Sequence, residues 1–199
     1  DCAAQAGLRG EAIAIEDIGL SEDGRFTALD DTVIGSLFKL YPLEDLMTES
    51  FGQALPASGV QLLEPAWKAI LSNKGVLPLL WQRHRGHPNL LAAEFDDGSA
   101  LPRGWVRKPL FSREGANVAM RLADGSWQES EGPYTGPAIR QAAHPLTAFD
   151  GGYPLIGSWV VGDQACGMGI REDNSRITRD SARFVPHAII DEAPTRIFV

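Results

Sequence analysis

The sequence has few cysteines, no long apolar run and no excess of basic charge. Cys2 and Cys166 are its only cysteines, too few for a disulfide framework or a zinc site, so a reducing, cytoplasmic compartment is expected. No apolar run approaches the length of a membrane span, and Gly75–Trp81 comes nearest. The net charge of −8 argues against the basic stripe of a nucleic-acid-binding surface, although it allows a local basic pocket for phosphate. We therefore expect neither a membrane nor a nucleic-acid partner.

What is present is an ordinary globular composition. The chain has 199 residues, of which 44% are hydrophobic and 22% charged, enough for one domain with a sizeable core. Ala3, Ala4 and Ala6 favour a helix that Gly7 would end. A chain that starts at the end of a helix is expected to be a piece of a longer protein.

The pattern of apolar residues predicts an α+β fold with mostly antiparallel strands and few helices. The tryptophans Trp67, Trp81, Trp105 and Trp159 are expected in the core. Residues 173–180 are polar and expected to be mobile. Helices are expected at 43–51, 64–71 and 74–84, and strands at 12–18, 25–29, 33–41, 60–63, 105–110, 118–122, 126–128, 153–161, 165–171 and 184–190, with 138–145 extended.

The most informative stretch is 105–118, W-V-R-K-P-L-F-S-R-E-G-A-N-V. A strand alternates its faces, so Val106, Lys108 and Leu110 should project to one side, and a cation on an apolar face needs a partner or a ligand. In the following loop, Gly115 lets backbone N–H groups approach an anion closely. The pattern fits either a lid over nucleotide phosphates or a hairpin with a solvated lysine, because short glycine motifs also occur by chance.

Several motifs, in order along nearly the whole chain, carry a resemblance. They are E-P-A-W-K-A-I-L-S-N-K-G-V-L-P-L-L-W, V-R-K-P-L-F-S-R-E-G-A-N-V, F-D-G-G-Y-P-L-I-G-S-W-V-V-G-D and G-M-G-I-R-E-D-N-S-R-I-T. Together they closely resemble the glutathionylspermidine synthase family, most of all the short bacterial homologues that lack the amidase domain. The resemblance implies that residues 1–199 are the C-terminal part of an ATP-grasp protein, with possible sub-lobes at 1–100 and 101–199.

The family's reaction activates a carboxylate with ATP to an acyl phosphate, which an amine then attacks to form an amide. The resemblance thus implies ATP and Mg²⁺ as cofactors, and a small-molecule or peptide carboxylate and a polyamine-like or other amine as substrates. It implies a catalytic role for Arg171, near the phosphates or the acyl group. The nucleotide contacts that it implies are Lys74, Lys108, Gln141 near the adenine, the phosphate loop of Arg113, Glu114, Gly115, Ala116 and Asn117, and the segment of Arg176, Ile177 and Thr178. From its composition, the loop 113–117 has few anchors and is expected to be mobile without nucleotide.

Two departures from the family affect these expectations. The family's magnesium ligands lie in a segment that would precede Asp1, so no metal ligand is expected in this chain; Glu172 and Asp173 are the best substitutes, with surface carboxylates as the simpler reading. The chain has Pro42-Leu43-Glu44 where the family typically has P-W-E, which leaves the acceptor open. We expect this chain alone not to turn over ATP. The alternatives are a nucleotide-binding or regulatory module without turnover, and a structural, partner-binding domain.

Overall fold

The computed structural model describes residues 2–97 and 104–189, and the chain divides into two compact units between Ser72 and Asn73. Unit 1 comprises residues 1–72 and unit 2 residues 73–199. The boundary expected at residues 100 and 101 lies outside the described residues. Strands β5 (Ala93–Phe95) and β6 (Gly104–Pro109), on either side of it, belong to one sheet. The expected sub-lobes 1–100 and 101–199 stay a prediction.

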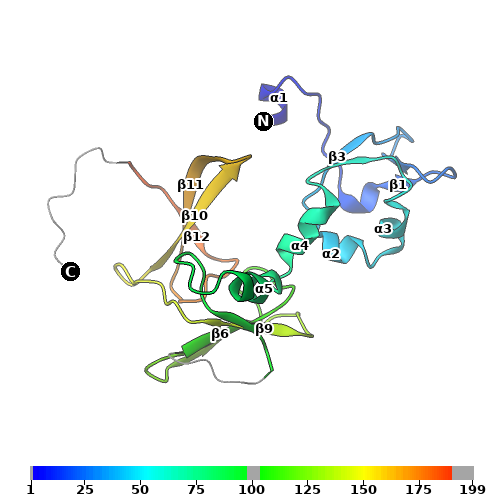
Figure 1. Cartoon of the computed structure of the whole chain (residues 1–199). Helices are drawn as coiled ribbons and strands as arrows, with labels where there is room; N and C mark the ends of the chain where they lie inside the picture. Colours follow the sequence, from blue (N-terminus) through cyan, green and yellow to red (C-terminus); the bar gives the residue numbers. More distant parts are fainter. Residues whose placement is uncertain (1, 98–103, 190–199) are drawn as a thin grey trace. The chain divides into compact units, whose positions relative to one another are not determined.

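Unit 1 is built from short elements (Figure 1). Its two sheets each have two strands: β1 pairs antiparallel with β2, and β3 pairs parallel with β4. The helix expected at the start of the chain is present, and Gly7 ends it with a φ of 73°. The elements of unit 1 are α1 (Cys2–Gln5), the 3₁₀ helix Ile15–Asp17, β1 (Gly19–Leu20), β2 (Phe26–Thr27), β3 (Ser36–Phe38), α2 (Leu43–Leu46), α3 (Ser50–Ala54), β4 (Gln61–Leu63), the 3₁₀ helix Ala66–Lys68 and α4 (Ala69–Ser72).

Two expectations for the secondary structure of unit 1 were wrong. The strand expected at 12–18 is instead a 3₁₀ turn, closed by hydrogen bonds from Asp17 N to Ala14 O (3.1 Å) and from Ile18 N to Ile15 O (3.4 Å). The single helix expected at 43–51 is two helices, because the chain becomes extended at Glu49. Gly52 packs so closely on the carbonyl of Leu46 that a Cβ there would lie 1.8 Å from its oxygen, so this tight turn of two helices requires glycine.

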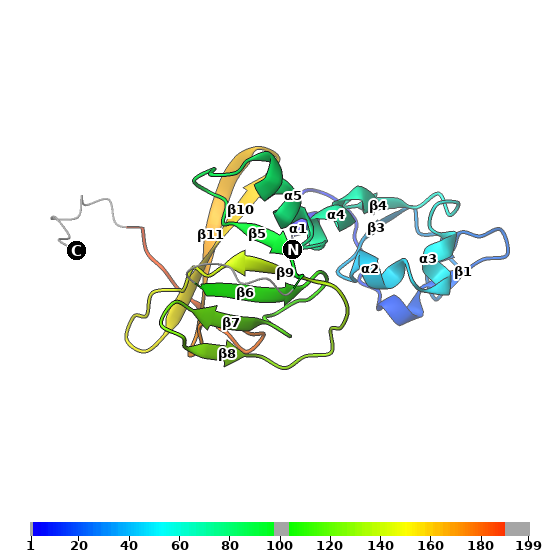
Figure 2. The same cartoon turned by 60° about the horizontal axis from the view of Figure 1, so that its bottom comes forward.

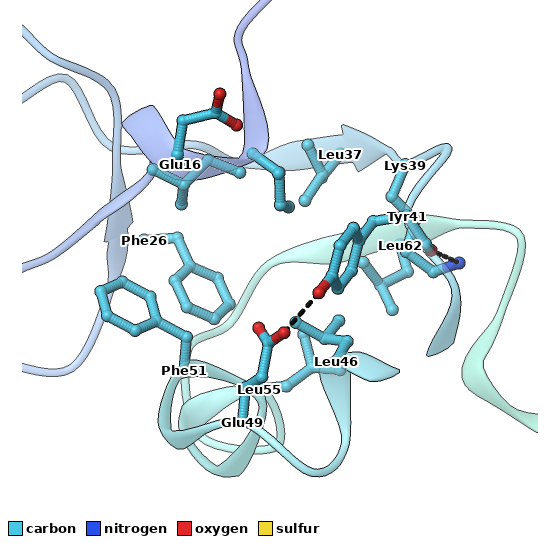
Figure 3. Close-up of a pocket in the computed structure, with 12 residues that line it drawn as sticks. Glu16, Phe26, Leu37, Lys39, Tyr41, Leu46, Glu49, Phe51, Leu55 and Leu62 are labelled. Carbon is cyan, nitrogen blue, oxygen red and sulfur yellow. Dashed lines mark hydrogen bonds between the residues drawn. The ribbon is translucent and has the colours of Figure 1, made fainter. Parts of the chain in front are cut away.

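The apolar interior of unit 1 is small. Phe26, Leu43 and Leu46 are buried, and the rings of Phe26 and Phe51 stack at 6.4 Å (Figure 3). Trp67, expected in the core, is 61% exposed. Its helical spacing indicated an apolar face, but nothing in the pattern shows whether that face is covered.

Unit 2 is dominated by a five-stranded antiparallel sheet in the order β5–β9–β6–β7–β8 (Figure 2). Val106, Val118 and Met120 project from one face and pack with Ile177. The remaining elements of the unit, in chain order with β5 and β6 given above, are α5 (Val76–Arg83), β7 (Ala119–Leu122), β8 (Trp127–Glu129), β9 (Ala138–Ala142), β10 (Tyr153–Val161), β11 (Gln164–Asp173) and β12 (Arg183–Val185).

A second antiparallel sheet joins β10, β11 and β12. The expected hairpin of β10 and β11 is confirmed, with its turn at Gly162-Asp163. Trp159, near this turn, is 69% exposed, so its expected place in the core was wrong. The strand expected at 184–190 is shorter than predicted, because β12 ends at Val185 and residues 186–189 are not in a strand. The fold is thus mixed, with mostly antiparallel sheets and few helices, as the sequence predicts. Within the described ranges, no helix combines the length and apolar character needed to cross a membrane.

Candidate nucleotide-binding site

Lys108 and Gln141, both implicated by the sequence, lie side by side on adjacent strands. Val106 of β6 pairs with Gln141 of β9, and strand alternation places Lys108 on the same face as Val106. The Lys108 ammonium donates a 2.9 Å hydrogen bond to the side-chain oxygen of Gln141. The prediction that Lys108 lies on an apolar strand face is therefore confirmed. The alternative, a lysine surrounded by solvent on a hairpin, is not.

The Lys108 charge is only weakly compensated. The side chain is half-buried, and within residues 2–97 and 104–189 no carboxylate pairs with its ammonium. Burial therefore lowers the pKa of Lys108 below its usual value. A neutral amide oxygen offsets only part of the cost of removing an ammonium from water. This position is electrostatically suited to an anion.

Lys74, which precedes α5, hydrogen-bonds to the residues that follow β6. Its backbone N–H donates to the Leu110 carbonyl (2.9 Å), and its ammonium donates to the Ser112 carbonyl (2.5 Å). The oxygen of the Asn73 side chain accepts the N–H of Gly75 (2.8 Å) just before α5. The structure thus places the two predicted lysines at the two ends of one short segment, 108–112.

The loop of residues 112–117 is better anchored than its sequence suggested. Gly115 has a φ of 70°, and a Cβ there would lie 2.5 Å from the Thr178 carbonyl oxygen. The hydroxyl of Ser130 donates to the Gly115 carbonyl, and the side-chain oxygen of Asn117 accepts the N–H of Tyr134 (2.7 Å). The expectation of few anchors was wrong, because these partners come from segments distant in sequence. The close approach of Gly115 also joins two segments that the sequence assigned to one site.

Arg171 contacts both the loop 112–117 and the segment that follows β11. Its guanidinium donates to the Glu114 carboxylate (3.0 Å) and to the Arg179 carbonyl (2.7 Å). The ion pair is partly exposed on both sides, so it contributes little to stability. The pair does, however, neutralise the positive charge of Arg171, the residue expected to be catalytic.

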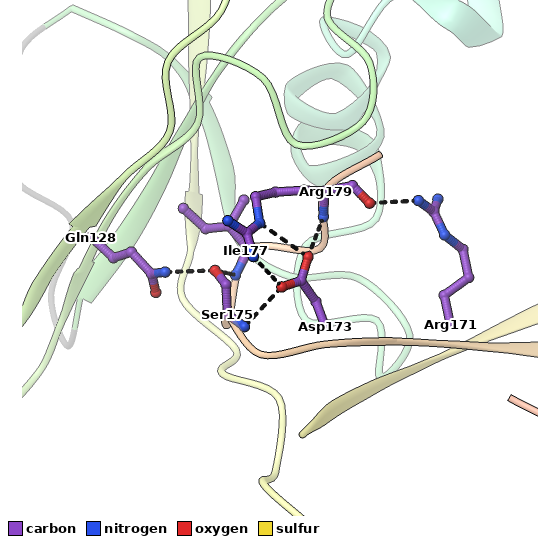
Figure 4. A network of polar contacts seen from close by, with 6 residues as sticks. All are labelled: Gln128, Arg171, Asp173, Ser175, Ile177 and Arg179. Carbon is purple, nitrogen blue, oxygen red and sulfur yellow. Dashed lines mark hydrogen bonds and ion pairs between the residues drawn. The ribbon is translucent and has the colours of Figure 1, made fainter. Parts of the chain in front are cut away.

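The polar segment 173–180 at the end of β11 is held by hydrogen bonds to Asp173 (Figure 4). The Asp173 carboxylate is buried and accepts bonds from the Arg179 guanidinium (2.7 and 3.2 Å), the Arg179 N–H (2.9 Å) and the Ser175 N–H (2.9 Å). These bonds, Arg179 foremost, lower the pKa of Asp173 to about 2. Ser175 in turn accepts bonds from Gln128 of β8 (2.6 Å) and from the Ile177 N–H (3.0 Å). Asp173 thus fixes the segment that contacts the loop, and the D-N-S sequence, typical of an Asx turn, was the available signal.

Arg176 is separated from this group. Its guanidinium lies over the Tyr153 ring (5.6 Å) and lines a small pocket beside β7 and β8. The side chain of Ile177 is buried in the sheet core, so of that segment the backbone at Thr178 is what contacts the loop. Hydrogen bonds join Lys108 to Gln141, Lys74 to Ser112 and Arg171 to Glu114. Arg176 takes part in none of these contacts.

The described residues do not fit a magnesium site. No group of three or more histidine, cysteine or acidic side chains converges within the described ranges. Asp173 is saturated by Arg179 and backbone N–H groups, and Glu172 pairs with Arg183 (2.5 Å). Glu172 and Asp173, named above as the best substitutes for the absent ligands, are thus both engaged by arginines.

Comparison with known proteins places the chain in a family. Residues 1–190 match the model described as glutathionylspermidine synthase preATP-grasp. The chain belongs to this glutathionylspermidine synthase family. The resemblance of its ordered motifs is thereby confirmed.

Three curated relatives extend the match. The chain is 43% identical to a Haemophilus influenzae protein provisionally named an acid–amine ligase, over 96% of this chain and 51% of that protein. It is 32% identical to trypanothione synthetase of Crithidia fasciculata, over 86% of this chain and 30% of the relative. It is 26% identical to glutathionylspermidine synthase of the same organism, over 74% and 27%. The chain therefore spans about half the length, or less, of the curated relatives it matches.

Proposed function

We propose that this chain supplies the nucleotide-binding surface of an ATP-dependent acid–amine ligase with an ATP-grasp fold. The observation that carries the proposal is the half-buried ammonium of Lys108, whose partner is a neutral amide oxygen. A phosphate oxygen would supply the missing negative charge. The names of the relatives, an acid–amine ligase, a synthetase and a synthase, support the class of reaction.

The proposed reaction transfers the γ-phosphoryl group of ATP to a substrate carboxylate. ADP leaves, and the amine then displaces phosphate from the acyl carbon to form an amide. Negative charge develops on the transferring group, so cations fixed around it lower the barrier. In this proposal Lys108 holds a phosphate oxygen, Lys74 positions the loop 112–117 over the phosphates, and Gln141 contacts the adenine.

Arg171 has the catalytic role in this proposal. Its charge is occupied by Glu114 in the structure, so it must exchange that carboxylate for a phosphoryl or acyl oxygen when the substrates bind. An exposed ion pair is weak enough for such an exchange. Glu114 then acts as a counter-ion that keeps Arg171 in place before the nucleotide arrives.

The test is ATP binding by calorimetry to the longest form of the protein that binds it. Lys108→Ala should weaken ATP binding about tenfold or more, the scale of a charged hydrogen bond. Lys68→Ala is the matched control, because Lys68 pairs with Glu64 at 3.7 Å on the surface of unit 1. Equal ATP affinity of the Lys108 variant and the parent protein would refute the proposal.

A separate expectation concerns residues 1–199 alone. ATP hydrolysis or transfer normally needs magnesium held on carboxylates, and the described residues lack such a group. We therefore expect no amine-dependent ADP release from this chain by itself. Amine-dependent ADP formation that Lys108→Ala abolishes would contradict this.

A further inference from the structure

Unit 1 has an apolar pocket that the proposed ligase reaction does not use. The pocket has a volume of about 320 Å³, and eight of its twelve lining residues have purely hydrocarbon side chains. They come from several segments between Ile15 and Leu62, and they include Phe26, Leu46 and Phe51. The volume is at the small end of the range for ligand sites, roughly 300–1,000 Å³. It suits a ligand body of a few carbon atoms.

One carboxylate is directed into this pocket. Figure 3 shows the side chain of Glu49, the residue before α3, pointing toward Tyr41, and the Tyr41 hydroxyl donates a hydrogen bond to it. Glu16 also lines the pocket, but its carboxylate points away in the same view. The ammonium of Lys39 donates to the Tyr41 carbonyl (3.1 Å). Glu49 is therefore the charged group that faces a ligand, held in place by Tyr41.

The charge of the whole unit favours a cation at this carboxylate. Residues 1–72 contain 12 acidic and four basic residues, a net charge of −8, whereas residues 73–199 contain 14 of each. The entire net charge of the chain thus lies in the unit that holds the pocket. Such a field attracts cations and repels anions over roughly a Debye length, about 8 Å at physiological ionic strength.

We propose that the pocket of unit 1 is a binding site for an organic monocation, with an ammonium group on Glu49 and an apolar body among the hydrocarbon side chains. An anion would meet the like charge of Glu49. A long polyamine would have to place a second ammonium among hydrocarbon side chains, at a high cost of desolvation. The proposal does not depend on nucleotide binding in unit 2, and its test measures no ligase activity.

The test uses hexylamine, which is cationic at pH 7, as the probe of the purified chain by two-dimensional NMR. Hexanol and hexanoate have the same apolar body with no charge and with a negative charge, and 1,4-diaminobutane has two charges and a short body. We expect hexylammonium to bind at least about fivefold more tightly than hexanol, because it adds a charged hydrogen bond, and hexanoate to bind least. Intermolecular NOEs should join its methylene protons to Leu46, Phe51 and Leu62.

Two glutamine variants separate the local carboxylate from the general field. Glu49→Gln should weaken hexylammonium binding about fivefold, whereas Glu22→Gln, which removes the same charge outside the pocket lining, should change it less than about twofold. Circular dichroism checks that both variants fold. Absence of NOEs to the pocket in the wild-type chain, equal binding of hexanol and hexylammonium, or equal effects of the two variants would each overturn the proposal.

Discussion

The Lys108 ammonium donates its hydrogen bond to the side-chain oxygen of Gln141, across two neighbouring strands and within a half-buried site. Among the described residues, no carboxylate forms an ion pair with this ammonium. Such a position lowers stability in return for affinity toward an anion.

Replacing the lysine with an apolar residue should separate stability from binding. Folding lowers the Lys108 pKa, so between its folded and unfolded values the unfolded chain binds more protons and stability rises with pH. Lys108→Met should therefore be as stable as the parent, or more stable by up to about 1 kcal/mol at pH 7, while losing ATP binding. Urea unfolding at pH 7 and pH 10 should show the advantage shrinking at high pH. A variant that is much less stable at pH 7 would contradict the electrostatic argument.

Gly115 should be intolerant of a side chain for two distinct reasons. Its positive φ disfavours any Cβ, and its close approach to Thr178 leaves no room for one. Gly115→Ala should lower the unfolding free energy by about 2–4 kcal/mol. Gly125→Ala is the control, because Gly125 has a φ of 84° in open space and should cost only about 1 kcal/mol. Similar losses in thermal or urea unfolding would show that the contact with Thr178 is not restrictive.

Asp173 should make the folded state sensitive to acid. Its pKa of about 2 lies below the ordinary 3.8, so its contribution is complete above pH 4 and is lost as the pH falls toward 2. Asp173→Asn should lower the unfolding free energy by up to about 2 kcal/mol at pH 7, and the gap from the parent should close between pH 4 and pH 2. The exposed Asp163→Asn, in the β10–β11 turn, is the control. A gap that is constant with pH would assign the loss to shape rather than charge.

Glu114 should restrain Arg171 without stabilising the fold. Because the ion pair is partly exposed, Glu114→Gln should change the unfolding free energy by less than about 0.5 kcal/mol. The same variant should tighten ATP binding a few-fold, since the Arg171 charge is no longer neutralised. Glu172→Gln, which removes the neighbouring carboxylate that pairs with Arg183, should leave the affinity unchanged. Weaker ATP binding by the Glu114 variant would instead make Glu114 itself a ligand contact.

The sequence predicts well those features that depend on local periodicity. Alternation alone placed Lys108 with Val106 on an apolar face, and the ordered motifs identified the family. Alternation could not show that Gln141 lies beside Lys108, because strand register is set by the whole sheet. The resemblance supplied Gln141, and the structure supplied the contact.

Non-local partners explain most of the errors. The loop 112–117 looked unanchored because Ser130 and Thr178 are far from it in sequence. Residues 173–180 looked mobile because their polarity was taken as solvation, whereas Arg179 returns to Asp173 and closes the segment. Trp67 and Trp159 were expected in the core but are exposed. Their spacing shows that they lie on an apolar face, but it does not show whether another part of the protein covers that face.

The two strands that hold Lys108 and Gln141 also carry an indole on their opposite face. Trp105 precedes Lys108 by three residues on β6, and its ring lies 4.6 Å from the guanidinium carbon of Arg140, the neighbour of Gln141 on β9. The Trp127 ring meets the Trp105 ring edge-on at 5.6 Å. A ligand that displaces Lys108 would act on the strand that also carries Trp105. We therefore expect Trp105, among the five tryptophans of the chain, to be an intrinsic fluorescent reporter of occupancy.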